Sequence, residues 1–287
     1  MEHNGRNNLE LRPKNEFEDY SDIDLEQVEE FQEEIFRSWF ENQDQPVLEA
    51  VESVKVDNPS TTAEKIKNLF ADSYMYTKRA EIRVDRQTKG FLDEKYPQER
   101  RDQFAFEDVS FQQDAVHFLR ECDNNELIEE FWSYFEENYD IMVGSDREKR
   151  GAKQGILAVN TVIDLLKKEG YEVEFPTSKQ DAVKKIDLIA EKDGSTLFLQ
   201  IKSTHNSKID ILQENDIKNK IESEKQREEL NRFFKVVSHN DSEGAVIRVP
   251  NVSKSEYLES NTGKIGDEGI ISNTELKNLH SQLPLDN

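Results

Sequence analysis

The stretch DGSTLFLQIKST, residues 193–204, combines an apolar strand pattern with two polar side chains at its far end. Thr196 to Ile201 run as a buried strand would, yet Gln200 and Lys202 stand where that strand finishes. Burying a lysine without a partner is costly, so core strands avoid it. The strand end therefore either emerges into solvent or lies in a polar site.

The residues just upstream favour the polar site. Residues 188–190 suit a second strand, and Asp193-Gly194 is typical of a two-residue hairpin turn, because glycine tolerates the positive φ of a type I′ turn. Such a turn places Asp187 directly opposite Gln200. Side chains alternate with a period of two, so Lys202 shares their face. One hairpin thus brings together a carboxylate, an amide and an ammonium group.

Composition indicates a polar chain made in a reducing compartment. The chain has 287 residues, of which 34% are hydrophobic and 34% charged, and its single cysteine, Cys122, excludes an intrachain disulfide. No apolar run approaches the roughly 18 residues of a membrane span, and the N-terminus lacks a signal-peptide core. We expect a cytoplasmic or otherwise intracellular protein with no membrane partner.

The net charge of −23 is distributed unevenly. Residues 1–50 carry 4 basic and 15 acidic groups, and residues 101–150 carry 5 and 14. Residues 151–250 are nearly neutral, with 16 and 17. The acidity therefore belongs to the N-terminal half, and long-range steering of nucleic acid would be weak, while local lysines and arginines could still hold phosphates.

Hydrophobic periodicity predicts four regions along the chain. Residues 1–20 read as a disordered tail, and 21–145 as an acidic, mainly helical domain. From Asp146 the pattern changes to a helix ended by Gly170, a strand at 171–175, the hairpin, a long charged helix over 209–234 and a strand at 244–249. This order predicts a mixed α/β domain over 146–250, followed by a polar extension over 251–287.

Asp187, Gln200 and Lys202 suit metal-dependent phosphodiester cleavage. A hard divalent ion such as Mg²⁺, or Mn²⁺, binds oxygen ligands and retains water. Asp187 would supply the anionic ligand, and the Gln200 side-chain oxygen and the Ile201 carbonyl the neutral ones. Lys202 would hold the attacking water or offset developing negative charge.

Residues 155–204 resemble the core of the PD-(D/E)xK nuclease superfamily, and are most similar to archaeal Holliday-junction resolvases and Mrr-like restriction endonucleases. The resemblance rests on helix–Gly–strand, then Ile-Asp-Leu-Ile-Ala, a short turn and Leu-Phe-Leu-Gln-Ile-Lys-Ser-Thr. It implies a restriction-endonuclease-like mixed sheet flanked by helices. It assigns the metal and catalytic positions to Asp187, Gln200 and Lys202, with Ile201 contributing its carbonyl. The glutamine is similar to the QxK form of Mrr-like enzymes.

The chain departs from the resolvase pattern on the first helix. Resolvase-like members carry a glutamate about eleven residues before the glycine, where this chain has Val159. Glu148 lies upstream of that register and Asp164 downstream. Glu148 and Glu174 are additional metal-ligand candidates, although a solvated helix start is the favoured reading of Glu148 and a solvent-facing strand edge that of Glu174.

Other side chains near the motif have two readings each. His205 follows the motif and would contact substrate, or else it is a surface-loop histidine. A group of basic residues would bind DNA phosphates, or else it forms an ion-paired, solvated helix face with the neighbouring glutamates. This group consists of Lys218, Lys220, Arg227 and Arg232.

The sequence therefore predicts a metal-dependent endonuclease that cleaves DNA, and dimerisation would suit double-strand cleavage. One alternative is a catalytically inactive nuclease-fold module that binds nucleic acid or protein. The other is an acidic interaction protein whose N-terminal half binds a basic protein partner. Retention of Asp187 and Lys202 favours the enzyme, and the missing helix glutamate favours the inactive module.

Overall fold

The structure is a computed structural model, and it describes residues 20, 23–41, 51–89, 98–140, 146–204, 209–221, 223–239 and 242–250. The predicted tail, apart from Tyr20, and the predicted extension over 251–287 lie outside the described residues. Contacts divide the chain into two units, whose described residues belong to Lys14–Ala152 and Lys153–Asn287. The division falls inside a helix, α7, and each unit is described here by itself.

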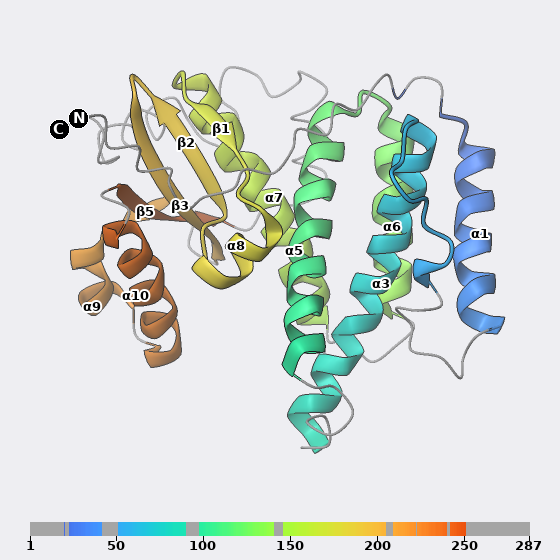
Figure 1. Cartoon of the computed structure of the whole chain (residues 1–287), viewed down its shortest axis with the longest axis horizontal. Coiled ribbons are helices and arrows are strands. Elements are labelled where there is room, and N and C mark those ends of the chain that lie inside the picture. Colours follow the sequence, from blue (N-terminus) through green and yellow to red (C-terminus); the bar gives the residue numbers. More distant parts are fainter. Residues whose placement is uncertain are drawn as a thin grey trace. The chain divides into compact units, whose positions relative to one another are not determined.

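The N-terminal unit is helical (Figure 1). Its long helices are α1 (Leu25–Glu41), α3 (Thr62–Lys89), α5 (Gln98–Glu121) and α6 (Asn125–Asp140). Helix α3 packs against the other three. The interior is aromatic because the apolar stripes of these helices converge on it, with fully buried Phe70, Phe111, Phe118, Phe131, Trp132 and Phe135. Tyr20 is also buried, with its ring 5.6 Å from that of Phe118.

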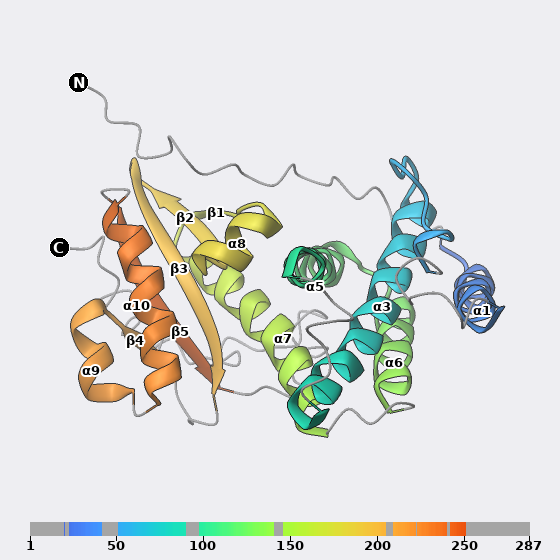
Figure 2. The ribbon, with the colours of Figure 1, turned by 60° about the horizontal axis from the view of Figure 1, so that its bottom comes forward.

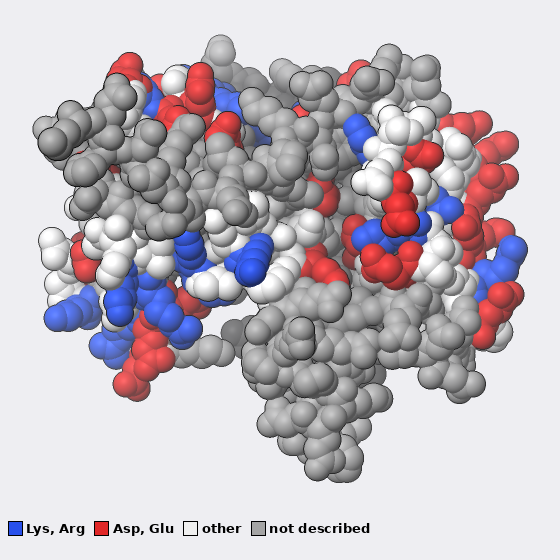
Figure 3. Space-filling model, viewed as in Figure 1, with Lys and Arg blue, Asp and Glu red and all other residues white. Residues whose placement is uncertain are grey.

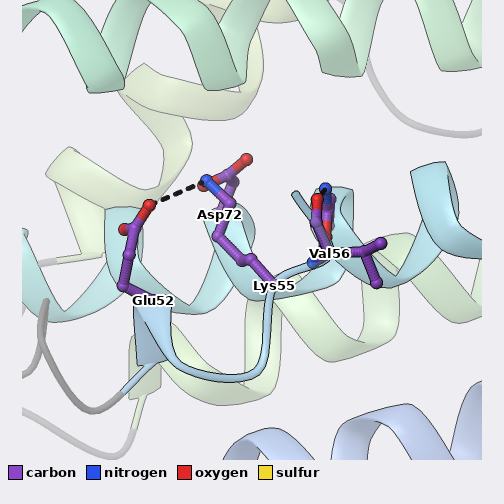
Figure 4. A network of polar contacts seen from close by, with 5 residues as sticks. Glu52, Lys55, Val56 and Asp72 are labelled. Atoms are coloured by element: carbon purple, nitrogen blue, oxygen red, sulfur yellow. Dashed lines mark hydrogen bonds and ion pairs between the residues drawn. The ribbon is translucent and has the colours of Figure 1, made fainter. Parts of the chain in front are cut away.

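Polar contacts tie the segment before α3 to the helix itself (Figure 4). Lys55 Nζ lies 2.9 Å from an oxygen of Asp72 and 3.7 Å from one of Glu52. The Asn68 side chain pairs with both backbone groups of Val56, at 2.8 and 2.9 Å. These bonds satisfy backbone groups that no ladder or helix would otherwise pair.

The C-terminal unit is an α/β fold around a five-stranded mixed sheet, as predicted in outline. In chain order its elements are α7 (Asp146–Lys168), β1 (Glu172–Glu174), α8 (Ser178–Lys184), β2 (Leu188–Lys192), β3 (Ser195–Thr204), β4 (Asp210–Leu212), η1 (Glu214–Asp216), α9 (Ile217–Lys220), α10 (Glu224–His239) and β5 (Glu243–Pro250). The strand order is β1-β2-β3-β5-β4, in which β3 and β5 are parallel and the other neighbours antiparallel. Figure 2 shows the sheet running between α7 and α10.

The hairpin forms as predicted. Asp193 and Gly194 both have positive φ, 52° and 81°, as a type I′ turn requires. The ladder pairs Lys192 with Ser195 and continues to Leu188 with Leu199. Strand β3 then extends past the end of β2, and over these residues it pairs with β5 only.

Gly170 ends α7, again as predicted. Its φ of 85° is the left-handed conformation that glycine adopts without strain. The N–H of Tyr171 donates to the Leu166 carbonyl at 3.0 Å, and that of Gly170 to Lys167 at 3.1 Å. These two bonds form a Schellman motif, which turns the chain into β1.

The predicted helix over 209–234 is wrong in its first half. The structure has β4, the 3₁₀ turn η1 and the short helix α9 there, and only then α10. Leu212, Ile217 and Ile221 have the spacing of one helix face, and all three side chains are buried. They belong to different local structures, because Leu212 ends β4, Ile217 begins α9 and Ile221 follows α9. Pairing of β4 with β5 outweighed the local helical pattern.

Helix α10 covers the face of β3 that carries Phe198, Gln200 and Lys202. The side chains packed there form one buried cluster with Val246 and Leu212 from the neighbouring strands, and α10 contributes Leu230, Phe233, Phe234 and Val237. At the far end of this face the apolar cluster gives way to polar residues.

None of the helices among the described residues is long and apolar enough to span a membrane.

Candidate functional site

Asp187, Gln200 and Lys202 meet where β3 extends beyond β2. Gln200 and Lys202 lie on β3, and Asp187 is the residue just before β2. The Asp187 N–H donates to the Leu199 carbonyl at 2.8 Å, so the aspartate leaves the ladder one residue before the predicted pairing with Gln200. The structure thus brings the three predicted residues together through a slightly different backbone path.

The Asp187 carboxylate takes the place of the missing strand partner. Its Oδ2 accepts the N–H of Ile201 at 2.6 Å. The N–H and C=O of one strand residue face the same neighbour, so the Ile201 carbonyl also faces the Asp187 side, where β2 has ended. The predicted carbonyl ligand is therefore on the same side of the strand as the predicted carboxylate ligand.

Helix α10 adds Glu229, which the sequence does not single out as a site residue. It is one of the glutamates of the solvated, ion-paired reading, but its Oε1 lies 2.6 Å from Lys202 Nζ and 3.3 Å from Gln200 Nε2. A signal was present, because Glu229 precedes Phe233 by four residues and Val237 by eight, the spacing of the buried stripe. A carboxylate on an apolar stripe needs a partner, and Lys202 is that partner.

Burial and charge act against each other at the two carboxylates. Burial raises the pKa of Asp187, the adjacent Lys202 and the Ile201 N–H lower it, and the net shift is upward although the residue as a whole keeps some exposure. Glu229 adds to the rise by repulsion. Burial would also raise the pKa of Glu229, but attraction and a hydrogen bond from Lys202, with Lys185 and Arg232 farther out, lower it.

Gln200 holds a buried oxygen without a partner. The residue is 1% exposed, its Nε2 donates to Glu229, and its Oε1 has no hydrogen-bond partner. An unpaired buried acceptor costs about 1–3 kcal/mol, and native structures tolerate few of them. An unpaired amide oxygen in a cluster that also contains the Glu229 carboxylate is suited to binding a cation.

A second ion pair lies on the neighbouring strands. Arg248 on β5 is in register with Lys202 on one side and with Asp210 of β4 on the other, and its Nη2 pairs with the Asp210 carboxylate. Partners in register share a face of the sheet. A row of charged groups therefore crosses three strands at this end of the sheet.

Among the additional ligand candidates, the structure describes the side chain of Glu174 alone. Glu174 is on β1 in register with Ile189, half-buried, and no contact with Asp187 or Lys202 is found among the described residues. Glu148 lies in α7, but its side chain is outside the described part of the structure. His205 also lies outside the described residues. Val159, in the register of the resolvase glutamate, is half-buried on α7.

The predicted phosphate-binding residues lie on α9 and α10, where Figure 3 shows basic side chains gathered at lower left. Lys218 is exposed, while Lys220 pairs with Asp216 at 3.2 Å. Arg232 is exposed and acts on Glu229, and Arg227 is half-buried. Both readings of this face therefore keep support, since basic residues gather there and one of them is ion-paired.

The site offers oxygen donors suited to a hard divalent ion, but few of them are charged. Asp187, the unpaired Gln200 oxygen and the Ile201 carbonyl are all oxygen donors. No group of three or more histidine, cysteine, aspartate or glutamate side chains able to hold a metal occurs among the described residues.

Comparison of the chain with protein-family models, with curated proteins and with solved structures finds no significant match.

Proposed function

We propose that the C-terminal unit is a metal-dependent nuclease of the PD-(D/E)xK type, acting on DNA. The observation that carries the proposal is the buried, unpaired Gln200 Oε1 on the end of β3 that extends past β2, where Ile201 binds Asp187 and where Lys202 also lies. The element order of helix, three strands, helix and strand, with an inserted α8 and β4, supports the expected core. Asp187 and Lys202 are the residue types that phosphodiester hydrolysis needs.

Each residue has a defined task in this proposal. The Asp187 carboxylate, the Gln200 oxygen and the Ile201 carbonyl would hold Mg²⁺ or Mn²⁺, which supplies an acidified water and neutralises phosphate charge. The Lys202 ammonium group would lie beside the scissile phosphate and stabilise the negative charge that develops on it. The Ile201 N–H fixes the Asp187 side chain in one orientation.

The alternative of an inactive binding module draws support from a different observation. Glu229 Oε1 lies 2.6 Å from the Lys202 ammonium, so the lysine is engaged within the protein. If that pair persisted with DNA bound, Lys202 would neutralise no phosphate charge. The site would then be a structural remnant on a nucleic-acid-binding or protein-binding domain.

Cleavage assays separate the two functions. Three substrates would be tested with Mg²⁺ or Mn²⁺: linear duplex, single-stranded and four-way-junction DNA. Each would be incubated separately with the full-length wild type, with the Asp187→Ala variant and with the Lys202→Ala variant. We expect each variant to lose at least about 100-fold in rate, as removal of one transition-state contact does. Glu228→Ala and Lys235→Ala, exposed on α10, are the matched charge controls and should cleave normally. A folded wild type that cleaves none of the three substrates would favour the binding module.

A further inference from the structure

Glu229 presents a carboxylate to the site from outside the hairpin. One oxygen, Oε1, accepts from both Gln200 Nε2 and Lys202 Nζ. The other oxygen has no hydrogen bond with any described residue. The Gln200 amide in this cluster is 1% exposed and offers an unpaired oxygen. The cluster thus contains a carboxylate oxygen and an amide oxygen that no donor in the described part of the chain uses.

The charges around Lys202 suit a cation of higher charge. Asp187 and Glu229 both interact electrostatically with Lys202, and Glu229 acts on Asp187 in turn. Two carboxylates therefore share the Lys202 ammonium group within a partly buried space, while Lys185 acts on both of them and Arg232 on Glu229. A divalent ion would balance both, and the number of charged ligands is what sets the affinity of an oxygen site.

We propose that Glu229 is the second carboxylate of the divalent-cation site, and that it exchanges Lys202 for the metal when the metal binds. This inference rests on the proposed nuclease function and deepens it. Glu229 would supply the second carboxylate that α7 lacks, because Val159 occupies the position of the expected glutamate. It also couples two events, because metal binding to Glu229 releases the Lys202 ammonium toward the phosphate.

Metal binding without DNA tests the exchange directly. Mn²⁺ titration calorimetry would be run on the full chain, Asp187→Asn, Glu229→Gln and the exposed neighbour Glu228→Gln, with folding checked by circular dichroism. We expect Asp187→Asn and Glu229→Gln each to weaken Mn²⁺ binding by about tenfold or more, as loss of an important ligand-shell group does. Glu228→Gln should bind as the wild type does.

Lys202→Met provides a second measurement that does not remove Glu229. If the ammonium and the metal compete for the same carboxylate, this variant should bind Mn²⁺ about tenfold more tightly, because one like charge has gone. In the Glu229→Gln background the same substitution should produce a smaller gain. A purely structural Lys202–Glu229 pair would not produce that dependence.

The outcomes distinguish a failure of the Glu229 inference from a failure of the proposed function. A folded wild type that binds no Mn²⁺ would overturn the metal-dependent function itself. Mn²⁺ binding that is lost in Asp187→Asn but unchanged in Glu229→Gln would overturn the role of Glu229 and leave the function standing. Should Glu229→Gln not fold, an unchanged Mn²⁺ affinity in Lys202→Met would overturn the exchange on its own.

Discussion

At the residue scale, the carboxylate of Asp187 lies in surroundings that disfavour its charge. Its carboxylate has one backbone donor and an adjacent ammonium, yet burial still raises its pKa above the ordinary value of 3.8. The charged form is therefore less favoured in the folded chain than in the unfolded one. Residues kept in such surroundings are often functional, because a neutral residue would stabilise the fold better.

Asp187→Asn should therefore make the chain more stable near pH 7. The amide keeps an oxygen for the Ile201 N–H and removes the buried charge. We expect a gain of about 0.5–2 kcal/mol, the common range for a stabilising substitution. Urea denaturation in the presence of a chelator measures this gain without a contribution from bound metal.

The gain should depend on pH with a defined sign. A carboxyl group whose folded-state pKa is raised binds more protons in the folded chain, so wild-type stability falls as pH rises through the window above 3.8. The advantage of asparagine should be absent below that window and complete above it. A variant less stable than the wild type at neutral pH would show that the charge of Asp187 supports the fold.

At the element scale, the β2–β3 hairpin could be predicted because its determinants are local. Asp193-Gly194 specifies a type I′ turn, and the period of two then fixes the register and the shared face of Gln200 and Lys202. Gly170 could be predicted as the end of α7 for the same reason. Turn chemistry acts over a few residues and needs no knowledge of the rest of the fold.

The contribution of α10 could not be derived in the same way. Glu229 reaches Lys202 only because α10 packs on the sheet through Phe233 and Val237, a contact between residues far apart in sequence. The misassigned segment over 209–221 has the same cause, since its strand is defined by pairing with β5. Sequence periodicity indicates that a face is buried, but not which side chain of another element it meets.

Gly244 of β5 fixes how closely α10 approaches the sheet. A Cβ atom at this position would lie 2.7 Å from Cγ2 and 3.0 Å from Cγ1 of Val237 on α10. Valine is stiff at χ1, so the helix has to shift to make room. We expect Gly244→Ala to lower the free energy of unfolding by about 1–3 kcal/mol, the usual cost of overpacking, in urea denaturation.

Gly155 of α7 is the matched control for this substitution. Apart from its chain neighbours and the backbone of its own helix, no described atom lies within 4 Å of a Cβ built there, and alanine favours a helix over glycine by about 0.5–1 kcal/mol. Gly155→Ala should therefore raise stability slightly. If Gly244→Ala were equally benign, α10 would not be held against β5 at this point, and the placement of Glu229 would lose its main support.

At the scale of the whole molecule, the charge is segregated along the chain. Residues 1–150 carry 19 basic and 38 acidic groups, a net of −19 out of the total of −23. Figure 3 shows acidic side chains along α1 and basic ones near α9 and α10. Acting on DNA as proposed, such a chain would gain little from long-range attraction and would depend on local contacts with phosphates.

Salt dependence of DNA binding tests whether α9 and α10 supply those contacts. If Lys218, Lys220, Arg227 and Arg232 each neutralise one phosphate, the slope of log K against log salt should be about −3.6, since each contact contributes about −0.9. Fluorescence anisotropy with duplex DNA and the Asp187→Asn chain measures this slope without cleavage.

Replacing Lys218 and Lys220 together by alanine should reduce the steepness of that slope by about 1.8, because two of the four contacts are lost. The exposed Lys179 and Lys235, replaced together by alanine, remove the same charge from positions outside the predicted set and should leave the slope near that of the parent chain. An equal loss in both pairs would mean that only net charge matters. No loss in either would assign Lys218 and Lys220 to the solvated, ion-paired face that Lys220 already forms with Asp216.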